Sequence, residues 1–113
     1  MVKESSTNNL NRLSVLAKCP VTFTLEKIGG RWKPLIIWQL KEGKMRYNEL
    51  RKALPAISEK MLIQQLKELE TDEIVIREAR PVVPPFVEYS LSAKGKEIRP
   101  ILGAMAEWGI RNQ

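Results

Sequence analysis

The 113-residue sequence predicts a mainly α-helical α+β fold, and three observations support this prediction. First, residues 57–69 carry apolar side chains at helical spacing. Second, a shorter helical segment, residues 47–54, precedes them across the turn Pro55-Ala56-Ile57. Third, the apolar period changes after Leu69 from 3.6 to about 2, which is typical of strands. Two helices joined by a short turn and followed by a β-hairpin predict a winged helix-turn-helix with a two-stranded wing.

Composition narrows the classes of function. The net charge of +6 and pI of about 9.7 favour a polyanionic partner. The basic excess lies in residues 31–46, with five basic residues against Glu42, whereas residues 47–80 hold six bases and seven acids. The chain has no histidine and a single cysteine. We therefore expect no enzyme, metal site or cofactor, no internal disulfide and a cytoplasmic protein without a membrane span.

The N-terminal part predicts a flexible segment followed by two helices. Residues 1–9 are polar, and residues 10–113 form one domain. The first helix carries a narrow apolar stripe that needs a partner surface: Leu10, Leu13, Leu16 and Ala17. Pro20 suits the first turn of the second helix, which runs to Ile28 and ends at Gly29-Gly30, where glycine can supply a left-handed residue.

Residues 31–54 predict a central helix and the first helix of the helix-turn-helix, which spans about residues 47–70. The central helix opens at Arg31-Trp32-Lys33-Pro34, continues to Leu40 and is apolar on much of its circumference. Met45-Arg46 is too short to be more than a bridge. In the next helix, four side chains are expected to face inward: Tyr47, Leu50, Ala53 and Leu54.

The helix that begins after Ser58 is the candidate reading helix. Ser58 is a suitable N-cap, and Met61, Leu62, Leu66 and Leu69 form its inner stripe. The outer face is polar and could lie in a DNA major groove. Gln64 suits an adenine edge, and Lys60 and Lys67 suit guanine or phosphate. An ordinary solvated helix face is the alternative interpretation.

The wing and one further helix complete the chain. Strands at about 74–80 and 86–91 bracket the proline-rich loop 81–85, so the wing spans about residues 74–91. Thr71-Asp72-Glu73 must turn into the first strand, and Asp72 is the residue best able to adopt a left-handed conformation. A last helix, about 92–110 with Ser92 as its cap, carries a stripe that includes Ile101, Met105 and Trp108.

Several motifs in order resemble the HxlR family of bacterial winged helix-turn-helix regulators. They are Cys19-Pro20-Val21, Ile28 to Trp32, Tyr47 to Arg51, Ile57-Ser58, Leu62 to Glu70, Val83 to Leu91, and Gly95, Pro100 and Ala106 to Gly109. The resemblance covers about residues 19–109. It implies a cytoplasmic homodimer that binds double-stranded DNA at a pseudo-palindromic operator and regulates transcription. It places the dimer interface on the first and last helices. Members of the family commonly carry a glycine where this chain has Glu73, which leaves the geometry of that turn open.

The predicted DNA-contacting residues fall into three groups. The reading helix contributes Ser58, Lys60, Ile63, Gln64 and Lys67, with Ser58 near phosphate and Ile63 near a thymine methyl. Arg77 and Arg80 lead toward the wing tip, where backbone contact and plain exposure are equally good interpretations. Arg46, Arg51 and Lys52 flank the first helix of the motif. The predicted dimer residues are Leu10, Leu13, Leu16, Ile101, Met105 and Trp108.

Cys19 is a candidate redox sensor. It precedes a helix N-terminus and adjoins Lys18, and both features lower a thiol pKa. By resemblance, some relatives sense oxidants or electrophiles through a cysteine in this region. A single thiol would need an intersubunit disulfide or an adduct with a small thiol. The alternative is a small buried hydrophobe.

The resemblance does not identify the operator, the regulated genes or the effector, nor whether the protein represses or activates transcription. A different class of function would be a winged helix used for protein association without sequence-specific DNA binding. An exposed apolar patch in place of the polar outer face would indicate that alternative.

Overall fold

The computed structural model describes residues 19–113. Its elements are α2 (Pro20–Ile28), α3 (Lys33–Gln39), the 3-10 turn η1 (Leu40–Glu42), β1 (Met45–Arg46), α4 (Tyr47–Ala53), α5 (Glu59–Thr71), β2 (Val75–Arg80), β3 (Phe86–Leu91), α6 (Ala93–Lys96) and α7 (Arg99–Asn112). The predicted helix over residues 10–17, with Leu10, Leu13 and Leu16, lies outside the described residues.

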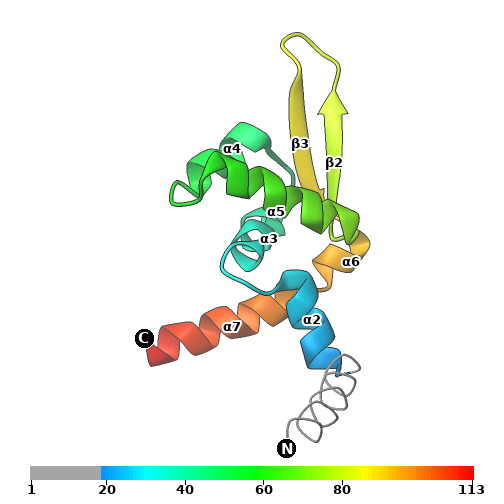
Figure 1. The fold of residues 1–113 in the computed structure, drawn as a ribbon. Helices are drawn as coiled ribbons and strands as arrows, with labels where there is room; N and C mark the ends of the chain where they lie inside the picture. The colour runs from blue at the N-terminus through cyan, green and yellow to red at the C-terminus, as the bar shows by residue number, and fades with distance from the viewer. Residues whose placement is uncertain (1–18) are drawn as a thin grey trace, which may run out of the picture.

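The elements form a helical body from which the β2–β3 hairpin projects as a wing (Figure 1). Helix α5 crosses the body beneath the wing, and α2 and α7 lie on the far side of the body from the hairpin tip (Figure 1). The sheet has the order β1-β3-β2 and is antiparallel throughout. The winged helix-turn-helix prediction is therefore confirmed.

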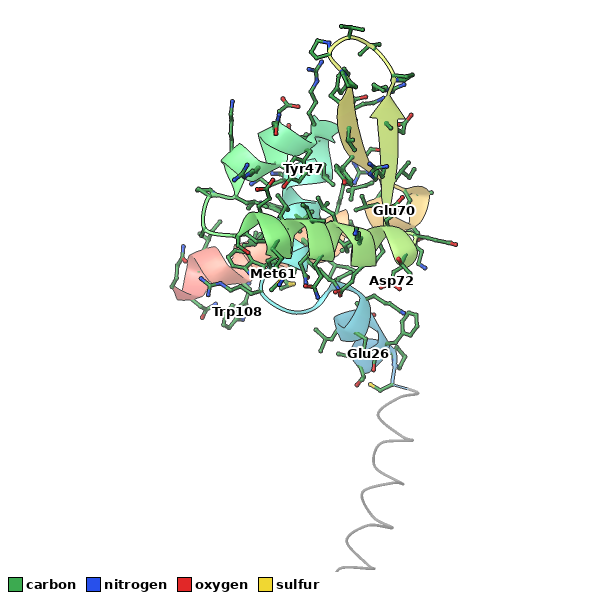
Figure 2. All side chains as sticks on the ribbon, turned by 45° about the horizontal axis from the view of Figure 1, so that its top comes forward. Glu26, Tyr47, Met61, Glu70, Asp72 and Trp108 are labelled. Carbon is green, nitrogen blue, oxygen red and sulfur yellow. The ribbon has the colours of Figure 1, made fainter. Side chains whose placement is uncertain are left out.

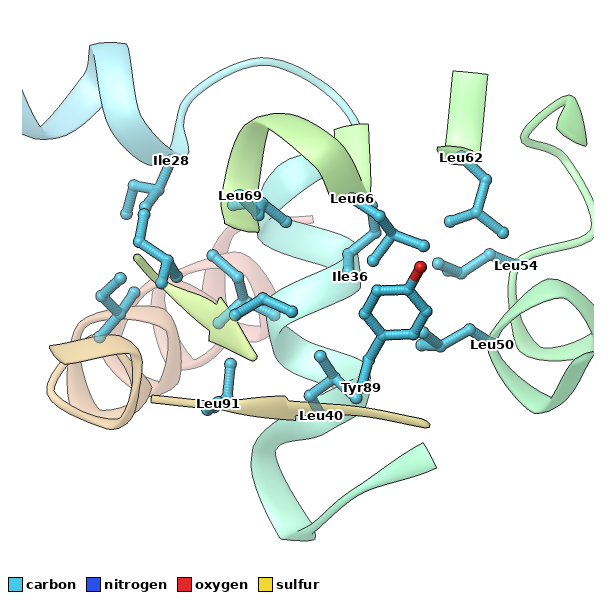
Figure 3. Close-up of a cluster of buried hydrophobic side chains, with 14 of the residues drawn as sticks. Ile28, Ile36, Leu40, Leu50, Leu54, Leu62, Leu66, Leu69, Tyr89 and Leu91 are labelled. Atoms are coloured by element: carbon cyan, nitrogen blue, oxygen red, sulfur yellow. The ribbon is translucent and has the colours of Figure 1, made fainter. Parts of the chain in front are cut away.

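The core lies where α3, α4 and α5 meet the base of the sheet (Figure 3). Its fully buried side chains include Ile36, Ile37, Leu40, Leu50, Leu62, Leu66, Leu69 and Ile74. Tyr89 and Leu91 of β3 close it from the sheet side (Figure 3). Burial of one such leucine stabilises the fold by about 2 kcal/mol. The inner stripe of α5 supplies three of these side chains, so its outer face is held in a fixed orientation.

Two details around β1 and α4 differ from the expectations. Met45 and Arg46 form a third, short strand, because they pair with Tyr89 and Glu88 of β3. That pairing joins residues far apart in the sequence, so the two-residue segment alone did not show it. Ala53, expected to point inward, is exposed, since α4 ends at this residue and its core contacts come from Leu50 and Leu54.

The turn between α5 and β2 contains a further difference. The prediction that Asp72 adopts the left-handed conformation is wrong: Asp72 has φ −83° and Glu73 has φ 61°. Backbone bonds from Glu73 N–H to the Glu70 carbonyl and from Ile74 N–H to the Leu69 carbonyl close the turn at this residue. The left-handed position is thus the one where family members commonly have glycine.

The C-terminal helix is two helices, not one. Ser92 caps only the short α6, accepting a bond from Gly95 N–H at 2.9 Å, and α7 begins at Arg99. Pro100 explains the break, because it has no N–H to donate to the Lys96 carbonyl. That carbonyl instead accepts a bond from Arg99 Nε at 3.2 Å.

The second glycine of the pair after α2 has the positive φ. Gly29 is extended, with φ −76°, whereas Gly30 has φ +87°. Only Ile28 of α2 is buried, and the other large apolar side chains of this helix are exposed: Val21, Phe23 and Leu25.

Candidate nucleic-acid interface

The outer face of α5 is polar and open to solvent. Ser58 caps the helix, its hydroxyl accepting a bond from Met61 N–H at 3.1 Å. The exposed residues of the outer face follow helical spacing: Lys60, Ile63, Gln64 and Lys67. Ile63 is 41% exposed and is the one large hydrophobic side chain among them. The face therefore offers hydrogen-bond donors and acceptors around one apolar contact, which suits the edges of base pairs.

An ion pair fixes α5 to the central helix α3 and reaches the outer face. Lys33 is 8% exposed, and its Nζ lies 2.6 Å from Glu68 Oε1. The hydrogen bond from Lys33 lowers the pKa of Glu68. Glu68 Oε2 in turn accepts a bond from Gln64 Nε2 at 3.2 Å. These contacts orient the Gln64 amide, and among residues 19–113 its oxygen and one N–H have no hydrogen-bond partner. Sequence patterns gave no sign of this pairing, because Lys33 and Glu68 are far apart along the chain.

A groove of about 810 Å³ lies between the N-terminal part of the helix-turn-helix, α5 and the wing. Lys67 of α5, Arg77 of β2 and Arg46 of β1 line it together. Tyr47 and Glu70, labelled in Figure 2, belong to the same lining on α4 and α5. Three elements thus bring cations from separate parts of the sequence to one groove. Such a groove next to a reading helix suits a sugar–phosphate backbone.

The two wing arginines lie on opposite faces of the sheet. Arg77 pairs in register with Tyr89, and Arg80 pairs with Phe86, three residues further toward the tip. Arg80 Nε lies 2.8 Å from Glu88 Oε1, and its Nη2 lies 3.5 Å from Glu78 Oε2. The hydrogen bond from Arg80 lowers the pKa of Glu88. Glu78 and Glu88 face each other across the strands, so the single charge of Arg80 is shared between two carboxylates within the wing.

The remaining candidate cations surround α4. The Arg46 guanidinium lies 3.7 Å from the centre of the Phe86 ring, which ties β1 to the wing. Arg51 Nη2 lies 3.4 Å from Glu59 Oε2, with both side chains about half exposed. Lys52 is exposed. The structure thus brings Arg46 into the lining of the groove and pairs Arg51 with Glu59 of the same lining, whereas Lys52 lies outside it.

Cys19 lies at the N-cap of α2 and is partly exposed. Backbone N–H groups of Thr22 and then Val21 lower the pKa of its thiol. The thiol is therefore accessible and has an increased thiolate fraction.

The outer surface of α7 is apolar. Ile101, Met105 and Trp108 lie on one stripe and are 47%, 57% and 63% exposed. Trp108 projects from α7 in Figure 2. Together with the exposed apolar residues of α2, the stripe leaves an apolar surface on the side of the body away from the wing tip (Figure 1).

Within residues 19–113, no helix is long and apolar enough to span a membrane. The same residues contain no cluster of three acidic or cysteine side chains that could hold a metal ion.

A helix-turn-helix, a wing and an exposed polar face on the second helix define the winged helix-turn-helix class of proteins. The family model described as HxlR-like helix-turn-helix matches residues 27–113. The chain therefore belongs to the HxlR-like helix-turn-helix family.

Named relatives are regulators of transcription. The chain is 50% identical over 95 residues to the HTH-type transcriptional regulator YybR of Bacillus subtilis, covering 84% of this chain and 76% of YybR. It is 50% identical over 96 residues to the putative regulatory protein MalR of Fusobacterium mortiferum, covering 84% and 91% of the two chains. Among solved structures, the redox regulator HypR in its oxidised form is 49% identical, with a TM-score of 0.80, and covers 84% of this chain and 98% of HypR.

Proposed function

We propose that the protein is a homodimeric, sequence-specific DNA-binding regulator of transcription that acts in the bacterial cytoplasm and has no catalytic role. The outer face of α5 carries the proposal. It is exposed, polar and held in position by the buried inner stripe and by the pair of Lys33 with Glu68. A protein-association module would need an apolar patch here, whereas Ile63 is surrounded by Lys60, Gln64 and Lys67.

Specificity comes from the first two turns of α5, with Gln64 and Lys60 at base edges and Ile63 at a thymine methyl. Affinity comes mainly from phosphate contacts. Lys67, Arg77 and Arg46 supply these from the groove. The proposed DNA-contacting residues also include Ser58, Arg51, Lys52 and Arg80. Arg80 differs from the others, because its charge is already paired with Glu78 and Glu88.

The decisive experiment is selection of binding sites from a pool of random duplex DNA at two salt concentrations. A dimer should enrich an inverted repeat whose half-sites lie about one helical turn apart. Salt-sensitive binding that enriches no sequence would contradict sequence-specific recognition. Absence of binding at both salt concentrations, with and without oxidant, would favour the association module.

Base readout and phosphate contact predict different results for two variants of α5. Gln64→Ala should relax base preference at one position in each half-site, costing about 1 to 3 kcal/mol against the preferred base. Lys67→Ala should weaken all sequences alike and reduce the salt slope by about one per subunit. Quantitative binding to the selected operator and to its single-base variants measures both effects. An unchanged binding profile in both variants would overturn the assignment of α5 as the reading helix.

A redox or electrophile signal acting through Cys19 forms part of the proposal. The partly exposed thiol with its lowered pKa supports it, and so does the similarity to a protein named as a redox regulator. Oxidation would join Cys19 to the same residue of a second subunit or to a small thiol; as the S–S bond forms, each thiol loses its proton to solvent and one electron to the oxidant.

Replacement of Cys19 by serine should leave DNA binding in reducing buffer unchanged and remove the response to a disulfide-forming oxidant. Because the thiol pKa is lowered, alkylation of Cys19 should reach half its maximal rate below the ordinary thiol pKa of about 8.5. The pH profile of alkylation by iodoacetamide measures this directly. A wild-type oxidant response in the serine variant would exclude Cys19 as the sensor.

A further inference from the structure

A second hollow, of about 420 Å³, lies on the sheet face that points away from the α5 groove. Its wall includes Ile76 and Ser90, which pair with each other across β2 and β3. The neighbouring pair, Arg77 and Tyr89, lines the α5 groove. Because successive strand residues point to opposite faces, Ile76 and Ser90 lie on the sheet face opposite to Arg77 and Tyr89. We call this second hollow the basic hollow.

Four cations from three segments line the basic hollow: Lys41, Lys44, Lys96 and Arg99. The lining contains one acid, Glu42. In the described part of the chain, none of the four cations forms an ion pair with a carboxylate. Two of the five basic residues in the segment 31–46, Lys41 and Lys44, thus line the basic hollow and not the reading helix.

Backbone contacts position two of these cations. Arg99 donates from Nη1 to the Lys41 carbonyl at 3.3 Å and from Nε to the Lys96 carbonyl at 3.2 Å. Lys41 donates to the Trp38 carbonyl at 3.3 Å, and its ammonium lies 4.4 Å from the centre of the Trp38 ring. The Arg99 guanidinium is therefore held between η1 and the end of α6, where its remaining donors can meet an anion.

The hollow also has an apolar side. Leu40 and Leu91 are buried, and Ile76, 46% exposed, stands beside them. Ser90 adds a partly exposed hydroxyl. A cationic rim around an apolar base fits a small molecule that combines negative charge with a short apolar body.

We propose that the basic hollow binds a small anion with two or more negative charges and a short apolar portion. The inference goes beyond the proposed DNA-binding function. Lys44, Lys96 and Arg99 hold the charged groups, and Ile76 contacts the apolar portion. DNA is the less suitable occupant, since the hollow faces away from the α5 groove. Arg99 begins α7, so the ligand would sit beside the N-terminal end of the proposed dimer helix.

Titration of the full chain with phenyl phosphate, followed by amide NMR shifts and calorimetry without DNA, tests the site. Phenyl phosphate carries nearly two negative charges above pH 7, like other phosphate monoesters. It should bind saturably and more tightly than inorganic phosphate, which lacks the apolar ring. The largest shifts should occur at Gly43, Ser90 and Lys96. Because DNA is absent, the result stands whether or not the DNA-binding proposal holds.

The variant Lys44→Gln with Lys96→Gln should bind phenyl phosphate about tenfold more weakly. The control, Lys94→Gln with Arg111→Gln, removes the same charge outside the hollow and should change affinity less than about twofold. Equal losses in both variants would show non-specific charge attraction and overturn the site. Shifts confined to the α5 groove, or no saturable binding, would overturn it too. If the wild-type protein does not bind phenyl phosphate and the first variant loses DNA affinity, the site is overturned and the cations of the basic hollow contact DNA phosphate instead.

Discussion

Trp108→Glu should convert the protein to a monomer and lower its affinity for a two-half-site operator by at least about a hundredfold. Trp108 is 63% exposed on the apolar stripe of α7, beside Met105 and Ile101. Large aromatic side chains at the centre of an interface commonly dominate its binding energy. A carboxylate at this position would be buried without a partner in a dimer, so association becomes unfavourable. Each half-site would then be bound independently.

Arg111→Glu provides the control for this prediction. Arg111 is exposed on the same helix, one turn beyond Trp108, and is not one of the apolar residues of the stripe; this substitution alters net charge more than Trp108→Glu does. If charge repulsion from DNA caused the loss, the Arg111 variant would lose more affinity. Sedimentation equilibrium measures the association state, and titration with one-site and two-site DNA measures affinity. If the Trp108→Glu protein remained a dimer, the stripe of α7 would not be the interface, and the exposed apolar residues of α2 would be the next candidate.

The fold was predictable because local signals agree with tertiary packing in the helix-turn-helix and wing. The inner stripe of α5, its Ser58 cap and the two long strands each depend on spacing within a short segment. The missed features depend on distant partners. Strand β1 exists only through β3, and the charge of Arg80 is paired only because register brings Glu78 opposite Glu88.

The turn after α5 shows a different limit. Asparagine and aspartate adopt left-handed conformations more readily than glutamate, which favoured Asp72. The fold places that conformation at Glu73, because the bond from Ile74 N–H to the Leu69 carbonyl fixes where β2 begins. The candidate site has the same limit. The outer face of α5 followed from periodicity, whereas the groove needs β1, α5 and β2 in three dimensions.

Gly95→Ala should destabilise the protein by about 2 to 3 kcal/mol, although alanine is normally the better helix former. Gly95 of α6 lies directly against the backbone of Ile74, the residue before β2. A β-carbon at Gly95 would overlap the Ile74 carbonyl oxygen, which cannot rotate away. That oxygen already accepts bonds from Ser92 N–H at 3.0 Å and from Ser92 Oγ at 3.1 Å. The contact therefore fixes the junction between the wing and the C-terminal helices.

Gly103→Ala separates the effect of this contact from the effect of helix propensity. Gly103 lies in α7, and apart from its chain neighbours and the backbone of its own helix, no atom of residues 19–113 lies within 4 Å of the position of an added β-carbon. Its replacement should raise the free energy of unfolding by up to about 1 kcal/mol. Urea denaturation of both variants at one protein concentration gives the comparison, because a dimer's stability depends on concentration. A stabilised Gly95→Ala protein would show that α6 can move away from β2, and that its close packing is not required for the fold.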